Sequence, residues 1–308
     1  MSTLYVTHPA FAGHIVPQGH PERPERMRAV EQALEAEVFQ PLIRVQAPLA
    51  EASVATLAHP ESFVEALDHT RPREGMVMID GDTTMSPGTW EALLRALGGV
   101  TLAVDEVMAG QARNAFCGMR PPGHHAEATT AMGFCFFNNA VVAARHAQRT
   151  HGAERVAIVD FDVHHGNGTQ ALVWDDPSLF YASTHQMPLF PGTGARSETG
   201  CGNVVNAPMR GGDGGAKFHE AFEDLILPAL KTFSPDLLII SAGFDAHERD
   251  PLGGLLLKGG DYAWMTRALI DVADETAGGR VVSVLEGGYD LRGLAESTTA
   301  HVRALMGA

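Results

Sequence analysis

The sequence predicts an α/β protein in three layers, with one mainly parallel β-sheet flanked by helices on both faces. Short apolar runs rich in Val, Ile and Leu alternate with helical patterns along the chain, as expected for parallel strands buried on both faces. Four of these runs end in polar, glycine-rich turns. No linker, internal repeat or low-complexity tract divides the chain, so we expect a single domain over residues 1–308.

The expected strands and helices alternate in order. Strands are expected at residues 3–7, 41–48, 115–119, 156–159, 178–183, 236–241 and 280–285. Residues 20–26 are expected to lead into a first helix that ends at about residue 37. Further helices are expected at 52–69, 86–108, 140–151, 214–233 and 262–276, and at the end of the sequence. Polar loops are expected at 8–24 and 80–87. This alternation is typical of a doubly wound sheet.

Charge and cysteine content exclude several kinds of protein. The net charge is −15 and no block of Lys or Arg occurs, which argues against nucleic acid as a partner. Cys117, Cys135 and Cys201 are an odd number without C-x-x-C spacing, so we expect no disulfide framework and a reducing compartment. No apolar run is long enough to span a membrane and no signal-peptide pattern occurs. We therefore expect a cytoplasmic protein that contacts no membrane; the sequence carries no signal for its oligomeric state.

The chain is organised around the stretch R-V-A-I-V-D-F-D-V-H-H-G-N-G-T-Q at residues 155–170. An apolar strand here ends in Asp160, Asp162, His164 and His165, so a buried strand delivers several polar groups to one place. Asp162 and His164 are two residues apart and point the same way in an extended chain. A carboxylate and an imidazole that face together suit a divalent metal such as zinc. The alternative is a polar turn whose aspartates cap the next helix.

A third ligand is available in another of the polar turns, G-F-D-A-H-E-R-D-P. Ligand sites of open α/β sheets lie at the carboxyl ends of the strands, so this turn and residues 160–165 are expected to meet. Asp250 fits best because a proline follows it, but the spacing also admits Asp245. Such an oxygen-rich set accepts zinc, and also iron(II) or cobalt.

Several motifs together resemble the histone deacetylase superfamily. They are R-P-P-G-H-H-A-E, G-F-C-F-F-N-N, D-F-D-V-H-H-G-N-G-T-Q, F-P-G-T-G, S-A-G-F-D-A-H-x-x-D-P and L-E-G-G-Y. The similarity is greatest to class II enzymes and to the bacterial histone deacetylase-like and acetylpolyamine amidohydrolases, and it extends from residue 20 to the last helix. The resemblance implies an arginase-like α/β fold and a zinc-dependent amide hydrolase with one Zn²⁺ per chain.

The resemblance also implies roles for individual residues. The implied zinc ligands are Asp162, His164 and Asp250. The implied catalytic residues are the tandem histidines His124 and His125, their partners Asp160 and Asn167, and the carbonyl-polarising Tyr289. The implied walls of a narrow acyl-lysine tunnel are Gly133, Phe134 and Phe190. A potassium ion is implied near Asp160, Asp162, His164, Ser183 and Thr184.

The two histidines are expected to divide the proton chemistry. Asn167 is neutral, so His125 is free to remain unprotonated and to act as the base and then the acid of amide hydrolysis. His124 lies beside the anionic Asp160 and should hold a proton more readily. The hydroxyl of Tyr289 is expected to stabilise the developing oxyanion.

The expected function is a zinc deacylase of acyl-lysine or other N-acylated alkylamines, and the sequence bears on three alternatives to it. A dedicated acetylpolyamine amidohydrolase is the nearest alternative, because one tunnel accepts all these linear amides. A dimanganese ureohydrolase needs additional bridging carboxylates, but Gly166 stands two residues after His164 and no D-x-D surrounds Asp250. A non-catalytic binding module would have lost a ligand or Tyr289, and neither loss has occurred.

Overall fold

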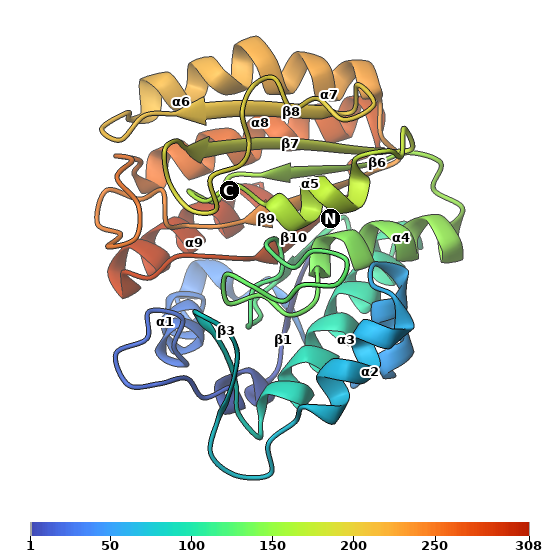
Figure 1. Ribbon diagram of the computed structural model, residues 1–308. Helices are drawn as coiled ribbons and strands as arrows, with labels where there is room; N and C mark the ends of the chain where they lie inside the picture. The colour runs from blue at the N-terminus through green and yellow to red at the C-terminus, as the bar shows by residue number, and fades with distance from the viewer. Residues whose placement is uncertain (1, 308) are drawn as a thin grey trace.

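The computed structural model describes residues 2–307, and its centre is an eight-stranded sheet in the order β2-β1-β5-β10-β9-β6-β7-β8 (Figure 1). Every strand pair in this sheet is parallel. Its strands are β1 Thr3–Thr7, β2 Ile43–Gln46, β5 Asn114–Cys117, β6 Val156–Asp160, β7 Leu179–Gln186, β8 Val204–Met209, β9 Leu237–Ala242 and β10 Val281–Leu285. The predicted α/β class with a mainly parallel sheet is confirmed.

Helices cover both faces of the sheet. They are α1 Glu25–Ala33, α2 Glu61–His69, α3 Thr89–Met108, α4 Asn139–His151, α5 Asn167–Val173, α6 Gly215–Ala221, α7 Leu227–Phe233, α8 Gly259–Thr276 and α9 Leu291–Leu305. The short helices are η1 Pro9–Gly13, η2 Glu37–Phe39, η3 Ala52–Leu57 and the π-helical η4 Phe222–Ile226 between α6 and α7. Helices α3, α4 and α5 form one layer, and α1, α9, α8 and the α6–α7 segment form the other (Figure 1).

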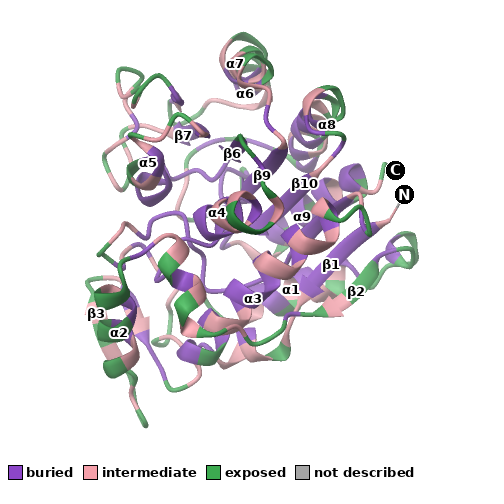
Figure 2. Ribbon diagram, turned by 90° about the vertical axis from the view of Figure 1, so that its right-hand side faces the viewer, coloured by how far each residue is buried: buried purple, intermediate pink, exposed green. Residues whose placement is uncertain are grey.

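The central strands are buried on both faces, which explains their apolar sequences. All residues of β6, β9 and β10 are buried. Figure 2 shows the buried residues gathered in the strands and on the helix faces turned toward them, with exposed residues on the outer faces. Among the helices within residues 2–307, none combines the length and the hydropathy that a membrane crossing requires.

Several expected elements differ from those of the structure. The expected loop at 80–87 contains part of an antiparallel hairpin, β3 Val77–Asp80 and β4 Thr83–Met85. Strand β8 and the short helix α5 were not predicted. β8 lies at the edge of the sheet and contains Asn206 and Pro208, which interrupt its apolar pattern; proline is tolerated there because an edge strand has one unpaired side. The expected helix at 52–69 is divided into η3 and α2 at Pro60.

The order of the strands places the four polar turns side by side. The turns follow β5, β10, β9 and β6, and these four strands are consecutive neighbours in the sheet. Because all four run in the same direction, their carboxyl ends meet at one edge, where open α/β sheets bind ligands.

Candidate active site

Two carboxylates and one imidazole meet where β6 and β9 end. The Nδ1 atom of His164 lies 3.1 Å from Asp162 Oδ1 and 3.1 Å from Asp245 Oδ2. All three side chains are buried, and their ligand atoms lie within 4.8 Å of one another. The backbone orients the carboxylates, because Gly287 N–H donates to Asp162 Oδ2 at 2.9 Å and Val163 N–H donates to Asp245 Oδ1 at 2.8 Å.

The buried carboxylates and imidazole of this group shift one another's pKa values. Burial first, and then the charge of Asp162, raise the pKa of Asp245 to about 7. Although burial opposes it, the contacts with Asp162 and Asp245 raise the pKa of His164 to about 10. His164 therefore holds a proton between two carboxylates, and a divalent cation at the same point would replace that proton. The donor set and its charge fit a metal.

Asp250, the expected third ligand, is not a member of this group. Its Oδ2 accepts hydrogen bonds from the backbone N–H groups of Tyr289 at 2.6 Å and Asp290 at 3.1 Å, and its Oδ1 accepts one from Leu252 at 3.0 Å. The Asp250 carboxylate is thus occupied in holding the turn that carries Tyr289. The structure replaces Asp250 with Asp245 as the third candidate ligand.

His124 is bonded to carboxylate, as the resemblance implies. Its Nδ1 lies 3.0 Å from Asp160 Oδ2, and its Nε2 lies 3.8 Å from Asp162 Oδ2. Burial disfavours its charged form, but Asp162 and Asp160 outweigh burial and raise the pKa of His124 to about 10. His124 is therefore protonated at neutral pH in this arrangement.

His125 lies beside an amide and has the opposite tendency. Its Nδ1 lies 2.8 Å from Asn167 Oδ1, while Asn167 Nδ2 donates to Glu127 Oε1 at 2.8 Å. Because Glu127 accepts from the amide nitrogen, the amide oxygen faces His125, and His125 Nδ1 is the donor. Burial and the charge of the neighbouring His124 lower the pKa of His125 well below its usual value. A neutral His125 with its proton on Nδ1 leaves Nε2 free to accept a proton.

A cavity of about 300 Å³ opens onto these groups. Its lining residues are Asp82, His125, Gly133, Phe134, His164, Leu189, Phe190, Leu252 and Tyr289. The ring of Phe134 lies edge-on to Tyr289, with 5.8 Å between centroids, and Phe190 lies edge-on to His125 at 5.1 Å. Phe190 is 41% exposed and so lies at the rim. The structure thus brings the three expected tunnel residues together around the histidines.

Glycine at position 133 lets the wall approach His125 closely. The backbone of Gly133 has a φ of 56°, and a Cβ added there would lie 2.5 Å from His125 Cδ2. A larger residue would therefore displace the ring.

Sequence reasoning missed several buried residues that support the site. Glu286 accepts from the backbone N–H groups of Gly123 at 2.6 Å and His124 at 3.1 Å, and burial raises its pKa to about 7. Arg26 is fully buried and donates to the Gly288 carbonyl at 2.7 Å, with its guanidinium 5.0 Å from the Tyr289 ring. The one available signal was the position of these charged residues inside the motifs L-E-G-G-Y and H-P-E-R-P-E-R.

Arg120 and Glu22 extend this support. Both are fully buried, and Arg120 donates to Glu22 through Nε and Nη2 at 2.7 Å each. Glu22 also accepts from Arg26 Nη1 at 2.9 Å. The segment at residues 20–26 is thereby fastened to the turns after β5 and β10, and the buried charges compensate one another.

Three of the residues expected around a potassium ion, Asp160, Ser183 and Thr184, lie in neighbouring strands of the sheet, and Asp162 and His164 follow β6. Asp160 of β6 is paired in register with Ser183 of β7, and Thr184 follows. The hydroxyl of Thr184 is buried without a hydrogen-bond partner among residues 2–307. A buried hydroxyl that lacks a partner is unusual and is compatible with a cation site.

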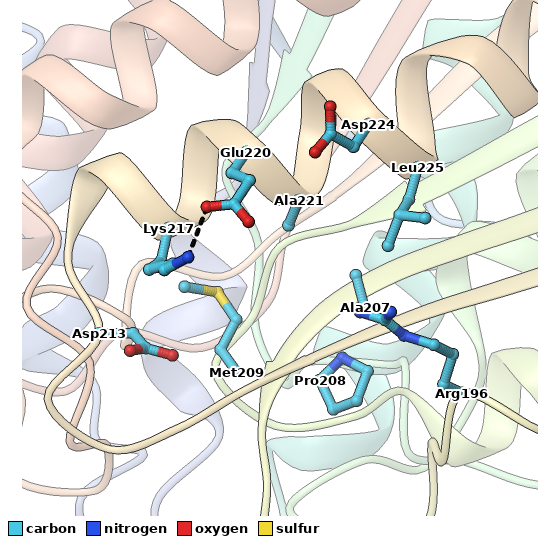
Figure 3. A pocket seen from close by; sticks show the side chains of 10 residues that line it. All are labelled: Arg196, Ala207, Pro208, Met209, Asp213, Lys217, Glu220, Ala221, Asp224 and Leu225. Atoms are coloured by element: carbon cyan, nitrogen blue, oxygen red, sulfur yellow. Dashed lines mark hydrogen bonds and ion pairs between the residues drawn. The ribbon is translucent and has the colours of Figure 1, made fainter.

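Another cavity, of about 290 Å³, lies between β8 and the α6–η4 segment (Figure 3) and has no lining residue in common with the first. Its lining carries charges of both signs, and Lys217 Nζ donates to Glu220 Oε2 at 2.6 Å across one side of it. It contains no histidine or cysteine and has none of the groups described above.

The fold and the site define a class of protein: a parallel α/β sheet that carries a candidate metal group and a pair of unequal histidines at the carboxyl ends of its strands. A family model, the histone deacetylase domain, matches residues 20–305. The chain therefore belongs to the histone deacetylase family of amide hydrolases.

Individual relatives agree with this assignment. Histone deacetylase 10, chloroplastic, of Oryza sativa subsp. japonica is 40% identical over 99% of this chain and 73% of its own length. The histone deacetylase-like amidohydrolase of Pseudomonas aeruginosa is 38% identical over 88% of this chain and 73% of its own length. The crystal structure of the HDA15 HD domain matches with a TM-score of 0.94 and 38% identity, covering 99% of this chain and 88% of that one.

Proposed function

We propose that this protein is a zinc-dependent deacetylase, built as one domain, that removes acetyl or related acyl groups from acyl-lysine or other N-acylated alkylamines. The observation that carries the proposal is the buried group Asp162–His164–Asp245 beside two histidines with opposite pKa shifts. Pairs of titratable groups whose surroundings push their pKa values apart are typical of divided acid and base roles.

Asp162, His164 and Asp245 would hold the metal. Two carboxylate oxygens and one imidazole nitrogen suit zinc, and iron(II) or cobalt are accepted by the same donors. When bound, the ion would supply Lewis-acid polarisation of the scissile carbonyl and acidify the attacking water. Three protein ligands would leave a position open toward the cavity, where the amide arrives.

The side chains of the chain itself would move the protons. Nε2 of His125 takes the proton of the attacking water and delivers it to the departing amine. His124, held in its charged form by Asp162 and Asp160, stabilises negative charge that develops on the substrate. The hydroxyl of Tyr289 donates a hydrogen bond to the carbonyl oxygen, and Asp250 and Arg26 hold the turn that presents it.

The cavity would select a linear substrate. Phe134 and Phe190 enclose an alkyl chain, and Gly133 keeps the passage against His125 narrow. An acetylated lysine or alkylamine places its amide at the end of such a chain. A bulky or branched amide would be excluded at the aromatic walls.

A dedicated acetylpolyamine amidohydrolase is the second candidate, and Asp82 favours it. Asp82 lines the cavity, and its Oδ1 accepts from Gly133 N–H at 3.0 Å. A polyamine carries further ammonium groups beyond the acetylated one, and a carboxylate near the passage would attract them. The dimanganese alternative lacks support, because Gly166 has no side chain to bridge a second ion.

A potassium ion near Ser183 and Thr184 is part of the proposal. The unpaired Thr184 hydroxyl would gain a partner, and a monovalent cation would offset the charge of Asp160. A cytoplasmic location and a small-molecule or peptide substrate, without nucleic acid, also stay predictions.

The proposal is tested by metal removal and a substrate panel. Dialysis against a strong chelator should abolish hydrolysis, and one equivalent of zinc or cobalt should restore it. The restored enzyme is then compared on acetyl-lysine peptides, acetylpolyamines and small acetylated amines. Undiminished activity in the fully demetallated protein would refute the metal role. A preference for acetylpolyamines that disappears in Asp82→Asn, with acetyl-lysine activity retained, would select the second candidate.

A further inference from the structure

A second group of histidine and aspartate side chains lies on the helical layer formed by α3 and α4. Asp105 belongs to α3, and His146 and His151 belong to α4. The Nε2 atoms of the two histidines lie 2.7 Å and 2.6 Å from the same atom, Asp105 Oδ1. One carboxylate oxygen thus faces two imidazole nitrogens. The two histidines follow Asp105 by 41 and 46 positions along the chain.

The geometry of this group is close to that of a metal site. Tetrahedral coordination at the usual zinc distances separates neighbouring ligand atoms by about 3.3 Å. Each imidazole would therefore have to withdraw from Asp105 by less than about 1 Å. The three ligand atoms already lie within 4.8 Å of one another, and the two rings are inclined at 75° with centroids 5.9 Å apart.

The surroundings orient one ring and leave access to solvent. Nδ1 of His146 lies 3.3 Å from the hydroxyl of Thr150, the kind of outer contact that fixes the orientation of a metal-binding imidazole. The side chains of His146, His151 and Asp105 are 18%, 22% and 46% exposed. An ion can enter, and water can complete its coordination.

The group is remote from the candidate active site. His151 is the last residue of α4, and β6 begins at Val156 shortly after it (Figure 1). Asp162 follows the opposite end of β6. Five residues of strand separate the two ends, a distance of about 16 Å.

We propose that Asp105, His146 and His151 form a second, surface metal site that takes one divalent ion of the zinc, nickel or copper kind. Two imidazole nitrogens and one carboxylate oxygen favour these ions over magnesium or calcium. The bound ion joins the carboxyl-terminal half of α4 to the last turn of α3. It stabilises the fold by binding the native state and takes no part in hydrolysis.

The site is tested by counting metal in the zinc-loaded protein. Titration with Ni²⁺ should add one equivalent to the wild type. Asp105→Asn, His146→Ala and His151→Ala should each lower the affinity for this added Ni²⁺. Loss of an outer contact typically lowers metal affinity by roughly 10–100-fold, and loss of a ligand should lower it at least as much. Added Ni²⁺ should raise the Tm of the wild type and leave the Tm of the triple variant unchanged. Hydrolytic activity should be the same in all of them.

A matched control is available elsewhere on the surface. His219 faces a single carboxylate, with Nε2 3.1 Å from Asp261 Oδ1, and the described residues supply no third ligand there. The His219→Gln variant should still bind the one added equivalent of Ni²⁺. Absence of an added equivalent in the wild type, or its persistence in the triple variant, would overturn the proposal. The readout is a difference between variants and does not depend on what the Asp162 group binds.

Discussion

The two groups of histidine and aspartate, Asp162–His164–Asp245 and Asp105–His146–His151, have similar composition and very different surroundings. The first lies at the carboxyl ends of central strands and is buried, with two oxygens to one nitrogen. The second lies on the outer helical layer, is open to solvent, and has two nitrogens to one oxygen. The same residue types can therefore serve different purposes in one chain.

The two groups also differ in how firmly the surrounding backbone holds their carboxylates. Backbone N–H groups hold both carboxylates of the buried group. The Nδ1 atom of His164 lies 3.1 Å from an oxygen of each carboxylate, close to the spacing that coordination requires. Within residues 2–307, Asp105 Oδ1 accepts from its two histidines alone, at hydrogen-bond distance. Burial and backbone-held carboxylates favour a preorganised catalytic site, whereas access to solvent favours an ion that exchanges with solution.

Loss of a buried ligand should have the largest effect. Asp245→Ala should remove the metal and reduce hydrolysis to background, because two remaining ligands do not retain an ion in competition with water. Metal content measured by elemental analysis, together with hydrolysis of an acetyl-lysine peptide, checks this. An Asp245→Ala protein that keeps its metal and its activity would return the role of third ligand to Asp250.

The unequal histidines should give the next largest effect. His125→Ala should lower kcat/KM by roughly 10²–10⁴-fold, the range typical for a positioned acid or base, and His124→Ala should be milder. Asn167→Asp places an anion beside His125 and raises its pKa, which now lies well below the usual value. The base works when neutral, so activity is lost as the pH falls through that pKa, and the acidic limb of the kcat/KM profile should move to higher pH.

The reverse ranking would contradict these roles. If Asn167→Asp left the acidic limb in place and His124→Ala were the more severe loss, His124 would be the residue that moves protons. Asn167→Ala is a useful companion, because it removes the hydrogen bond without adding a charge.

Asp250 should have a smaller effect of a different kind. Asp250→Asn weakens the hydrogen bonds to the Tyr289 and Asp290 N–H groups. The tyrosine turn should then be displaced, while Asp245 would still hold the proposed metal. We expect a fall in kcat of about 10–10²-fold, as displacement of a catalytic group by about 1 Å typically causes. Tyr289→Phe should lower kcat more than Asp250→Asn does, by roughly 10²–10³-fold. Steady-state kinetics and metal analysis distinguish this result from ligand loss, in which the metal content would fall as well.

Substitution of Asp105 should have the smallest effect on catalysis. Asp105→Asn should leave kcat/KM unchanged, because the residue lies at the other end of β6 from the candidate active site. A large loss of activity with normal zinc content would show that the two groups are coupled through α4 and β6 and do not serve separate purposes.

Sequence by itself determined the fold class and most of the residues that meet at the site. Buried parallel strands need continuous apolar runs, and these runs are visible in residues 156–159 and 236–241 without knowledge of any contact. The motifs also placed His124 with Asp160 and His125 with Asn167, and the structure brings both pairs within hydrogen-bond distance. Strand β8 escaped prediction because an edge strand does not need an unbroken apolar pattern.

Only the tertiary structure distinguishes Asp245 from Asp250 as the candidate third ligand. Both lie in one irregular turn after β9, where no helical or strand periodicity relates the direction of a side chain to its position. Asp250 is turned toward three backbone N–H groups, and Asp245 is turned toward His164. The meeting of Asp105 with His146 and His151 was likewise not visible in the sequence, because it depends on how α3 packs against α4. Such contacts between distant positions arise from packing, which a linear pattern does not record.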